Sequence, residues 1–105
     1  MSTALLIDGQ PVPGRGGEFA TINPATEETI GTVAYASCAD LDEALEAAAK
    51  GFRTWRATSA FERYKLIRKA ANLLRERADK IARIMTLEQG KPLAEAKMEV
   101  MGAAD

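Results

Sequence analysis

The 105-residue sequence predicts an α+β fold, a short N-terminal β meander followed by about four helices. Two observations support this division. Up to residue 39, apolar residues come in short runs separated by glycine, proline and asparagine, a pattern typical of strands and turns. From residue 40 they recur at steps of three and four, which is typical of amphipathic helices. We therefore divide the chain into 1–39, meander and loops, and 40–105, the helical part.

Extended structure is predicted at three places in the first third of the chain. Residues 5–7 form a short strand before an Asp-Gly turn, and residues 11–17, rich in proline and glycine, form an irregular loop. Residues 19–22 are extended as far as the Asn-Pro pair at 23–24, because the residue before a proline is pushed away from the helical region. Residues 29–35 form the clearest strand. Strands this short are only marginally stable on their own.

Two helix starts carry capping signals. Asp40 is predicted to cap the first helix, with Glu43 at the capping-box spacing, and Ser59 with Glu62 repeats the pattern for the second. A break is expected at 78–79. The predicted apolar faces are Leu41, Leu45, Ala48, Phe52 and Trp55; Phe61, Tyr64, Ile67, Ala70 and Leu74; Ile81, Ile84 and Met85; and Leu93, Ala96, Val100 and Ala103.

The last two helices are predicted to meet at Gly90-Lys91-Pro92. Glycine can close a helix in the left-handed conformation because it has no Cβ. Pro92 cannot continue that helix but suits the first turn of the next one, where an N–H group would be unpaired anyway. From the residues alone, this segment is a helix corner and nothing more.

The composition excludes several classes of function. Fourteen basic residues against fifteen acidic ones give a formal net charge of −1, which provides no attraction to nucleic acid or to an anionic membrane. No apolar run approaches the ~20 residues that span a bilayer. The single cysteine, Cys38, cannot form an internal disulfide, which favours a reducing compartment, with the cytoplasm as the default.

No self-contained active site is visible in the residues. The sequence has no histidine, so it lacks the commonest general base and metal ligand. The glycine-rich segment 14–17 precedes a strand rather than a helix, and so lacks the geometry that cradles phosphate. Cys38 has no accompanying base and is better explained as a structural cysteine.

Three blocks of sequence, in order, resemble the NAD(P)-dependent aldehyde dehydrogenase superfamily. They are Ile22-Asn23-Pro24-Ala25-Thr26-Glu27-Glu28 with Ile30-Gly31 and Val33; Asp40-Leu41-Asp42-Glu43-Ala44 through Ala47-Ala48 to Phe52 and Trp55; and Glu62-Arg63, Leu73–Asp79 and Glu88–Ala96. Together they cover essentially the whole chain. The run from Ile84 to Lys97 is most similar to the bacterial succinate-semialdehyde dehydrogenases.

The resemblance implies that the complete enzyme oxidises a small aldehyde to the carboxylic acid with NAD or NADP. In that family a cysteine thiolate attacks the carbonyl, a hydride passes to the cofactor, and a glutamate-activated water releases the acid. The corresponding cysteine, glutamate, asparagine and cofactor-binding segments lie beyond these residues, and Cys38 matches none of them. This chain is thus expected to start the α/β cofactor-binding domain, without catalytic or cofactor-binding residues of its own, in a parent enzyme that is a homo-oligomer.

The resemblance also implies one possible metal site. Many members hold a monovalent cation with a backbone carbonyl just before the Asn-Pro turn and an acidic residue on the helix after the Gly-Lys-Pro corner. Those positions are Ile22 and Glu99 here, and a third ligand would come from outside these residues. A solvated helix glutamate is an equally good interpretation of Glu99.

The last predicted helix is still apolar-periodic at Asp105, with no capping residue and an acidic residue where the helix dipole favours a basic one. We therefore expect a truncated chain whose apolar helix faces were meant for a sheet outside it. The alternative is a small stand-alone helical interaction module without enzymatic activity. It would need a core of its own.

Overall fold

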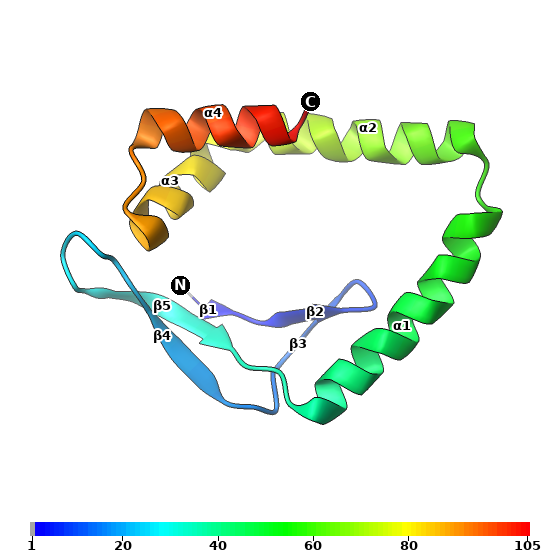
Figure 1. Cartoon of the computed structure of the whole chain (residues 1–105), viewed down its shortest axis with the longest axis horizontal. Helices are drawn as coiled ribbons and strands as arrows, with labels where there is room; N and C mark the ends of the chain where they lie inside the picture. The colour runs from blue at the N-terminus through cyan, green and yellow to red at the C-terminus, as the bar shows by residue number, and fades with distance from the viewer. Residues whose placement is uncertain (1) are drawn as a thin grey trace. The chain divides into compact units, whose positions relative to one another are not determined.

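The computed structural model describes residues 2–105 and confirms the predicted α+β class (Figure 1). Its elements are β1 (Ser2–Thr3), β2 (Leu5–Ile7), β3 (Gln10–Val12), β4 (Glu18–Ile22), β5 (Thr29–Ala34), α1 (Cys38–Ala57), α2 (Ala60–Glu76), α3 (Ala78–Gln89) and α4 (Leu93–Ala103). The chain divides into two compact units. Unit 1 holds the residues up to 21 together with 29–58, and unit 2 holds 22–28 together with 59–105.

The strands of unit 1 form two small sheets. One has the order β1-β5-β4, with β1 parallel to β5 through the pairs Ser2–Thr32 and Thr3–Val33. The other is an antiparallel hairpin of β2 and β3. Both turn residues of this hairpin, Asp8 and Gly9, have positive φ angles, as a two-residue type I′ turn requires. The predicted loop at 11–17 is thus wrong at its start, because residues 10–12 pair with β2.

The start of α1 differs from its predicted cap. The helix begins at Cys38, and its N-cap is Ser37, whose hydroxyl accepts a hydrogen bond from the Asp40 backbone N–H at 3.2 Å. Asp40 is the third helical residue, and its carboxylate accepts from the Ser37 N–H at 2.7 Å. The capping box is therefore Ser37 with Asp40, three residues earlier than the predicted pair of Asp40 and Glu43. At α2 the predicted cap is confirmed, since Ser59 Oγ accepts from the Glu62 N–H at 3.2 Å.

The hydrophobic core of unit 2 lies between α3 and α4, which pack side by side (Figure 1). Its buried residues are small: Ala78, Ala82, Ala96 and Val100. Side chains of this size let two helix backbones approach closely. The partly buried Leu74, Ile81 and Met85 pack around them. The predicted break is confirmed within one residue, because Arg77 separates α2 from α3.

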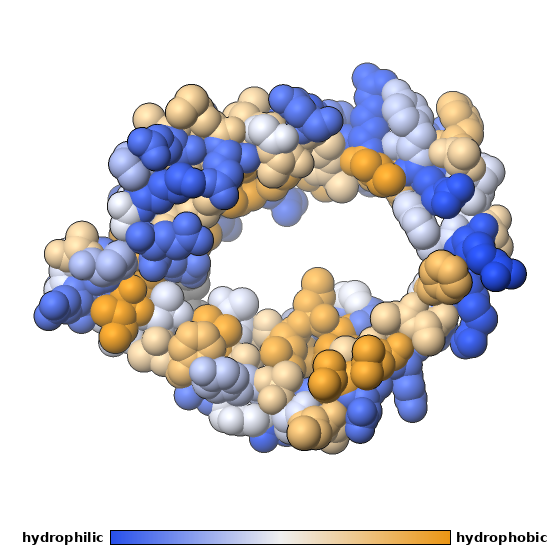
Figure 2. All heavy atoms as spheres, viewed as in Figure 1, coloured by the Kyte–Doolittle hydropathy of each residue, from blue (hydrophilic) through white to orange (hydrophobic). Residues whose placement is uncertain are grey.

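The apolar faces of α1 and α2 are not covered. Leu45 and Phe52 on α1 are about 60% exposed, and so is Phe61 on α2 (60%, 61% and 63%). Figure 2 shows such hydrophobic side chains open at the surface of the molecule. Over residues 2–105, none of the helices combines the length and the apolar character needed to cross a membrane.

Candidate functional site

The corner between α3 and α4 has the predicted backbone. Gly90 adopts the left-handed conformation, with φ of 73°, and its N–H donates to the Thr86 carbonyl at 2.9 Å. A Cβ at Gly90 would lie 3.1 Å from Cγ of Pro24, so the corner packs tightly against the Asn-Pro turn. Pro92 is the N-cap of α4, and its carbonyl accepts from the Ala96 N–H at 2.9 Å. Two segments far apart in sequence therefore meet within unit 2.

The Asn-Pro turn is held by its own hydrogen bonds. The Asn23 side-chain oxygen accepts from the Ala25 N–H at 3.0 Å, and the Asn23 carbonyl accepts from the Glu27 N–H at 2.8 Å. The Asn23 N–H donates to the Glu28 carbonyl at 2.9 Å. This turn follows directly after Ile22, the last residue of β4. The position of the Ile22 carbonyl is thus set by a closed turn.

Glu99 lies on the exposed side of α4, and its carboxylate forms an ion pair with the Lys91 ammonium. The structure places Ile22 and Glu99 in the same unit. Carbonyl and carboxylate oxygens are the donors that hard cations prefer, so the donor types fit a monovalent cation. The Lys91 ammonium competes for the same carboxylate. Within residues 2–105, no three histidine, cysteine or acidic side chains cluster in a way that could hold a metal ion.

A buried carboxylate joins the loop before β4 to the start of α1 in unit 1. Asp40 is only 2% exposed and accepts from the Arg15 N–H at 2.9 Å and from Arg15 Nε at 2.6 Å. It also accepts from the Ser37 hydroxyl at 2.8 Å. The backbone N–H groups of Ser37 and Arg15, together with the Arg15 guanidinium, hold the pKa of Asp40 well below its usual range. This arrangement anchors the loop to the start of the helix.

Arg15 also reaches a second carboxylate on α1. Its Nη2 lies 2.7 Å from Glu43 Oε1, and the side-chain hydrogen bonds to Glu43 and Asp40 raise the pKa of the guanidinium. Glu43, predicted as a capping residue, is instead an ion-pair partner of the loop. Sequence reasoning had treated the segment around Arg15 as a plain loop. The signal that could have revealed the pair is the presence of one arginine in a glycine-rich loop and acidic residues opening the next helix.

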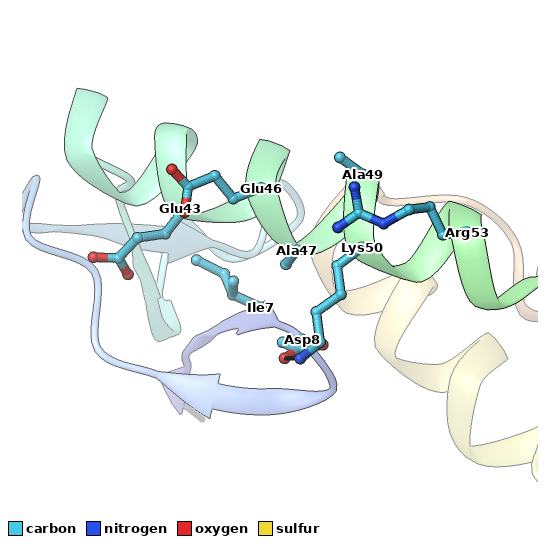
Figure 3. Close-up of a pocket in the computed structure, with 8 residues that line it drawn as sticks. All are labelled: Ile7, Asp8, Glu43, Glu46, Ala47, Ala49, Lys50 and Arg53. Atoms are coloured by element: carbon cyan, nitrogen blue, oxygen red, sulfur yellow. Dashed lines mark hydrogen bonds and ion pairs between the residues drawn. The ribbon is translucent and has the colours of Figure 1, made fainter.

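A surface hollow of about 630 Å³ lies between the β2–β3 turn and α1 (Figure 3). Charged side chains of both signs line it: Asp8, Glu43, Glu46, Lys50 and Arg53. Lys50 extends from α1 toward Asp8, with 3.4 Å between Nζ and Oδ2. The Lys50 ammonium is therefore held in a solvent-exposed ion pair with Asp8. Cys38 is exposed at the first position of α1, outside this hollow.

Comparison with known proteins places the chain in a family. The model of the aldehyde dehydrogenase family matches residues 12–105, nearly all of the chain. The chain belongs to the aldehyde dehydrogenase family.

Individual aldehyde dehydrogenases agree with this assignment. The glutarate-semialdehyde dehydrogenase of Pseudomonas aeruginosa is 46% identical over 99 residues, which make up 93% of this chain and 20% of that protein. An NAD-dependent aldehyde dehydrogenase from Sinorhizobium meliloti aligns with a TM-score of 0.95 at 35% identity, over 100% of this chain and 22% of that one. The NADP-dependent glyceraldehyde-3-phosphate dehydrogenase of Bacillus halodurans C-125 has a TM-score of 0.96 at 27% identity, with the same coverage.

The chain thus spans about a fifth of the length of the aldehyde dehydrogenases that it matches. The match begins at residue 12, in β3, and includes the Asn-Pro turn, the α3–α4 corner and all four helices. The predicted family, its N-terminal placement and the α+β fold are therefore all confirmed.

Proposed function

We propose that this chain is the N-terminal part of an oxidoreductase that oxidises an aldehyde to the carboxylic acid with NAD or NADP. The observation that carries the proposal is the family match over residues 12–105. It is supported by relatives named as NAD-dependent and as NADP-dependent enzymes, both with TM-scores of at least 0.95. The bound nicotinamide would accept the hydride in such a reaction.

The proposed substrate is a semialdehyde, which carries a carboxylate at the far end from the aldehyde. Succinate semialdehyde is the substrate that the sequence resemblance implies. The P. aeruginosa relative is named for glutarate semialdehyde, which is one methylene longer. Both compounds carry an aldehyde at one end and a carboxylate at the other. One methylene changes discrimination in a pocket by only about 10- to 200-fold, so a single enzyme can turn over both compounds.

In this proposal the chain supplies scaffold and no reacting group. Its described residues hold no phosphate cradle, since the segment 14–17 leads into β4 and is tied to α1 by Arg15. Cys38 is an exposed residue at the first position of α1. We therefore derive no cofactor step through these residues, and we expect the chain alone to bind no NAD(P) and to oxidise no aldehyde.

The monovalent cation site is part of the same proposal. The carbonyl of Ile22 and the carboxylate of Glu99 would contribute oxygen ligands, with a further ligand from another part of the enzyme. The packing of Gly90 against Pro24 supports it, because that contact joins the two segments that carry these groups. Binding would require the Lys91 ammonium to leave the Glu99 carboxylate or to share it.

The proposed setting is a cytoplasmic homo-oligomer that acts on a small molecule, without nucleic acid or membrane partners. The alternative is a stand-alone helical interaction module, which would need to cover its own apolar faces, yet those of α1 and α2 are open. Against it, the buried core of the described chain is confined to a few small residues of α3 and α4 and Ala104.

The test is a substrate comparison. The protein encoded by the complete open reading frame that contains these residues is purified and assayed for NADH and NADPH formation. Succinate semialdehyde, glutarate semialdehyde and an uncharged aldehyde of matched length are compared. We expect the highest kcat/KM for one of the two semialdehydes. Preference for the uncharged aldehyde would contradict the substrate proposal, and no oxidation of any aldehyde would contradict the proposed activity.

A further inference from the structure

The turn between β2 and β3 in unit 1 joins an aspartate directly to a glycine. Asp8 has a φ angle of 50° and Gly9 one of 75°, and the flanking residues Ile7 and Gln10 pair across the hairpin. A Cβ placed on Gly9 would have no heavy atom within 4 Å, so the space around this residue is open. None of the other aspartates is followed by glycine. Asp8 and Gly9 are therefore a unique pair in this sequence.

This pair can undergo a ring closure that needs no other reactant. The Gly9 backbone nitrogen attacks the carboxyl carbon of the Asp8 side chain, and a C–N bond forms. One carboxyl oxygen leaves with the N–H proton and the carboxyl proton as water, and the product is a five-membered succinimide. Water then opens the ring at one of its two carbonyls. Opening at the side-chain carbonyl restores aspartate, whereas opening at the main-chain carbonyl leaves an isoaspartyl link that runs through the Asp8 side chain.

The backbone of the turn is close to the conformation that the ring requires. In an L residue, a planar ring of this kind sets ψ near about −120°, which together with a φ of about +60° is the first central position of a type II′ turn. Asp8 already has the positive φ angle. The remaining change is a flip of the peptide unit between Asp8 and Gly9, which glycine accommodates because it populates both signs of φ. The strand pairs on either side of the turn can stay in place.

The Asp8 side chain is exposed to water and only weakly held. It is 61% exposed, and its carboxylate lies 3.4 Å from the Lys50 ammonium (Figure 3). Exposed ion pairs of this kind restrain their side chains little. We propose that Asp8 and Gly9 form a site of spontaneous modification, at which the β2–β3 turn passes through a succinimide to an isoaspartyl link. That link adds a carbon to the main chain of a two-residue turn, whose length sets the register of the hairpin.

The experiment follows the protein encoded by the complete open reading frame that contains these residues, incubated at neutral pH. Samples are digested at acidic pH, and isoaspartate is located by chromatography and electron-transfer mass spectrometry. Asp79 is the internal reference, because it lies in α3, where the helical backbone holds ψ near about −42° and away from the ring geometry.

Two variants test the geometry of the turn. Gly9→Asn is the matched control, because asparagine tolerates the left-handed region and can keep the turn, while its Cβ crowds the attacking nitrogen. Asp8→Asn also keeps the turn, since Asn-Gly is favoured in type I′ turns, and it closes the same ring with loss of ammonia. Far-UV circular dichroism of each purified variant checks that the fold remains.

We expect isoaspartate to accumulate at Asp8 at least about tenfold faster than at Asp79, and at least about fivefold more slowly in Gly9→Asn than in the parent, because glycine alone has no Cβ. Asp8→Asn should deamidate at this position, seen as an increase in mass, while Asn72 in α2 stays intact. A rate at Asp8 no higher than at Asp79, or one unchanged by Gly9→Asn, would overturn the inference. Deamidation in Asp8→Asn no faster than at Asn72 would also overturn it. These readouts do not depend on aldehyde oxidation, so they are independent of the proposed function.

Discussion

The guanidinium of Arg15 lies 2.6 Å from the carboxylate of Asp40, although 25 residues separate them in sequence. Asp40 also accepts from two backbone N–H groups, those of Arg15 and Ser37. The pair therefore fixes the loop before β4 against the first turn of α1. Charge-assisted bonds of this kind are about twice as strong as neutral ones.

Replacing Asp40 with Asn should lower thermal stability in a pH-dependent way. The pKa of Asp40 in the folded chain lies below its ordinary value of 3.8, so the folded state favours the charged carboxylate. The stability that the ionised Asp40 carboxylate adds to the folded state is fully present well above pH ~4. It is lost as the pH falls from there toward the lower pKa of the folded state. The Asp40→Asn variant should melt lower than the parent by about 5 °C at pH 7, and the difference should shrink toward pH 3.

The matched control is Glu46→Gln, which neutralises an exposed carboxylate on the same helix. Its melting temperature should stay near that of the parent at every pH. Thermal unfolding followed by circular dichroism from pH 7 to pH 3 provides both measurements. If the difference in melting temperature between Asp40→Asn and the parent widened as the pH was lowered, the predicted link between the Asp40 pKa and stability would have the wrong sign.

Gly90→Ala should destabilise unit 2 by about 1–2 kcal/mol, because an L residue in the left-handed region has its Cβ close to the following carbonyl oxygen. The new Cβ would also stand 3.1 Å from Pro24 Cγ. Gly51→Ala is the control, since Gly51 lies within α1 with open space around its Cβ position. It should stabilise the chain by about 0.5–1 kcal/mol. Urea unfolding of both variants measures the two free energies, and changes of the same sign would refute the proposed backbone role of Gly90.

The Lys91–Glu99 ion pair yields a prediction about cations in the complete protein. If Glu99 contributes a ligand, Lys91→Ala should lower the K⁺ concentration needed for half-maximal stabilisation, because a competing positive charge is removed. Glu99→Gln should abolish the K⁺ effect. The measurement is the melting temperature in KCl against the same concentration of choline chloride, since a ligand that binds only the folded state raises stability. A K⁺ response unchanged in both variants would rule out the site.

Local features of the fold were predictable from the sequence. The Gly90 corner, the Ser59 cap and the break predicted at 78–79, which falls at Arg77, each depend on residues within one or two helical turns. These preferences of helix ends for particular residues depend on local backbone geometry, so they can be recognised in the sequence without knowing the tertiary structure. The buried faces of α3 and α4 were partly predictable in the same way, because Ala96 and Val100 follow the helical period.

Long-range pairings were not predictable. The parallel pairing of β1 with β5 joins residues about thirty positions apart, and no local pattern encodes which strands become neighbours. The Arg15–Asp40 contact could not be predicted for the same reason, because the two residues lie 25 positions apart in the sequence. The sequence predicts Asp40 as the cap because a carboxylate suits that role, yet Ser37 provides the cap and leaves Asp40 to bind the loop. For the candidate cation site, the residue types came from family resemblance, and the Lys91 partner of Glu99 appears only in three dimensions.

The central claim is that this segment belongs to an aldehyde-oxidising enzyme while carrying none of the reacting groups. The most direct test is the rate of NAD(P)H formation from succinate semialdehyde by two purified proteins at equal molar concentration. One is the 105-residue chain, and the other is the product of the complete open reading frame that contains it. The account predicts turnover by the complete protein and none by the chain. Turnover by the chain, or its absence from both, would contradict the account.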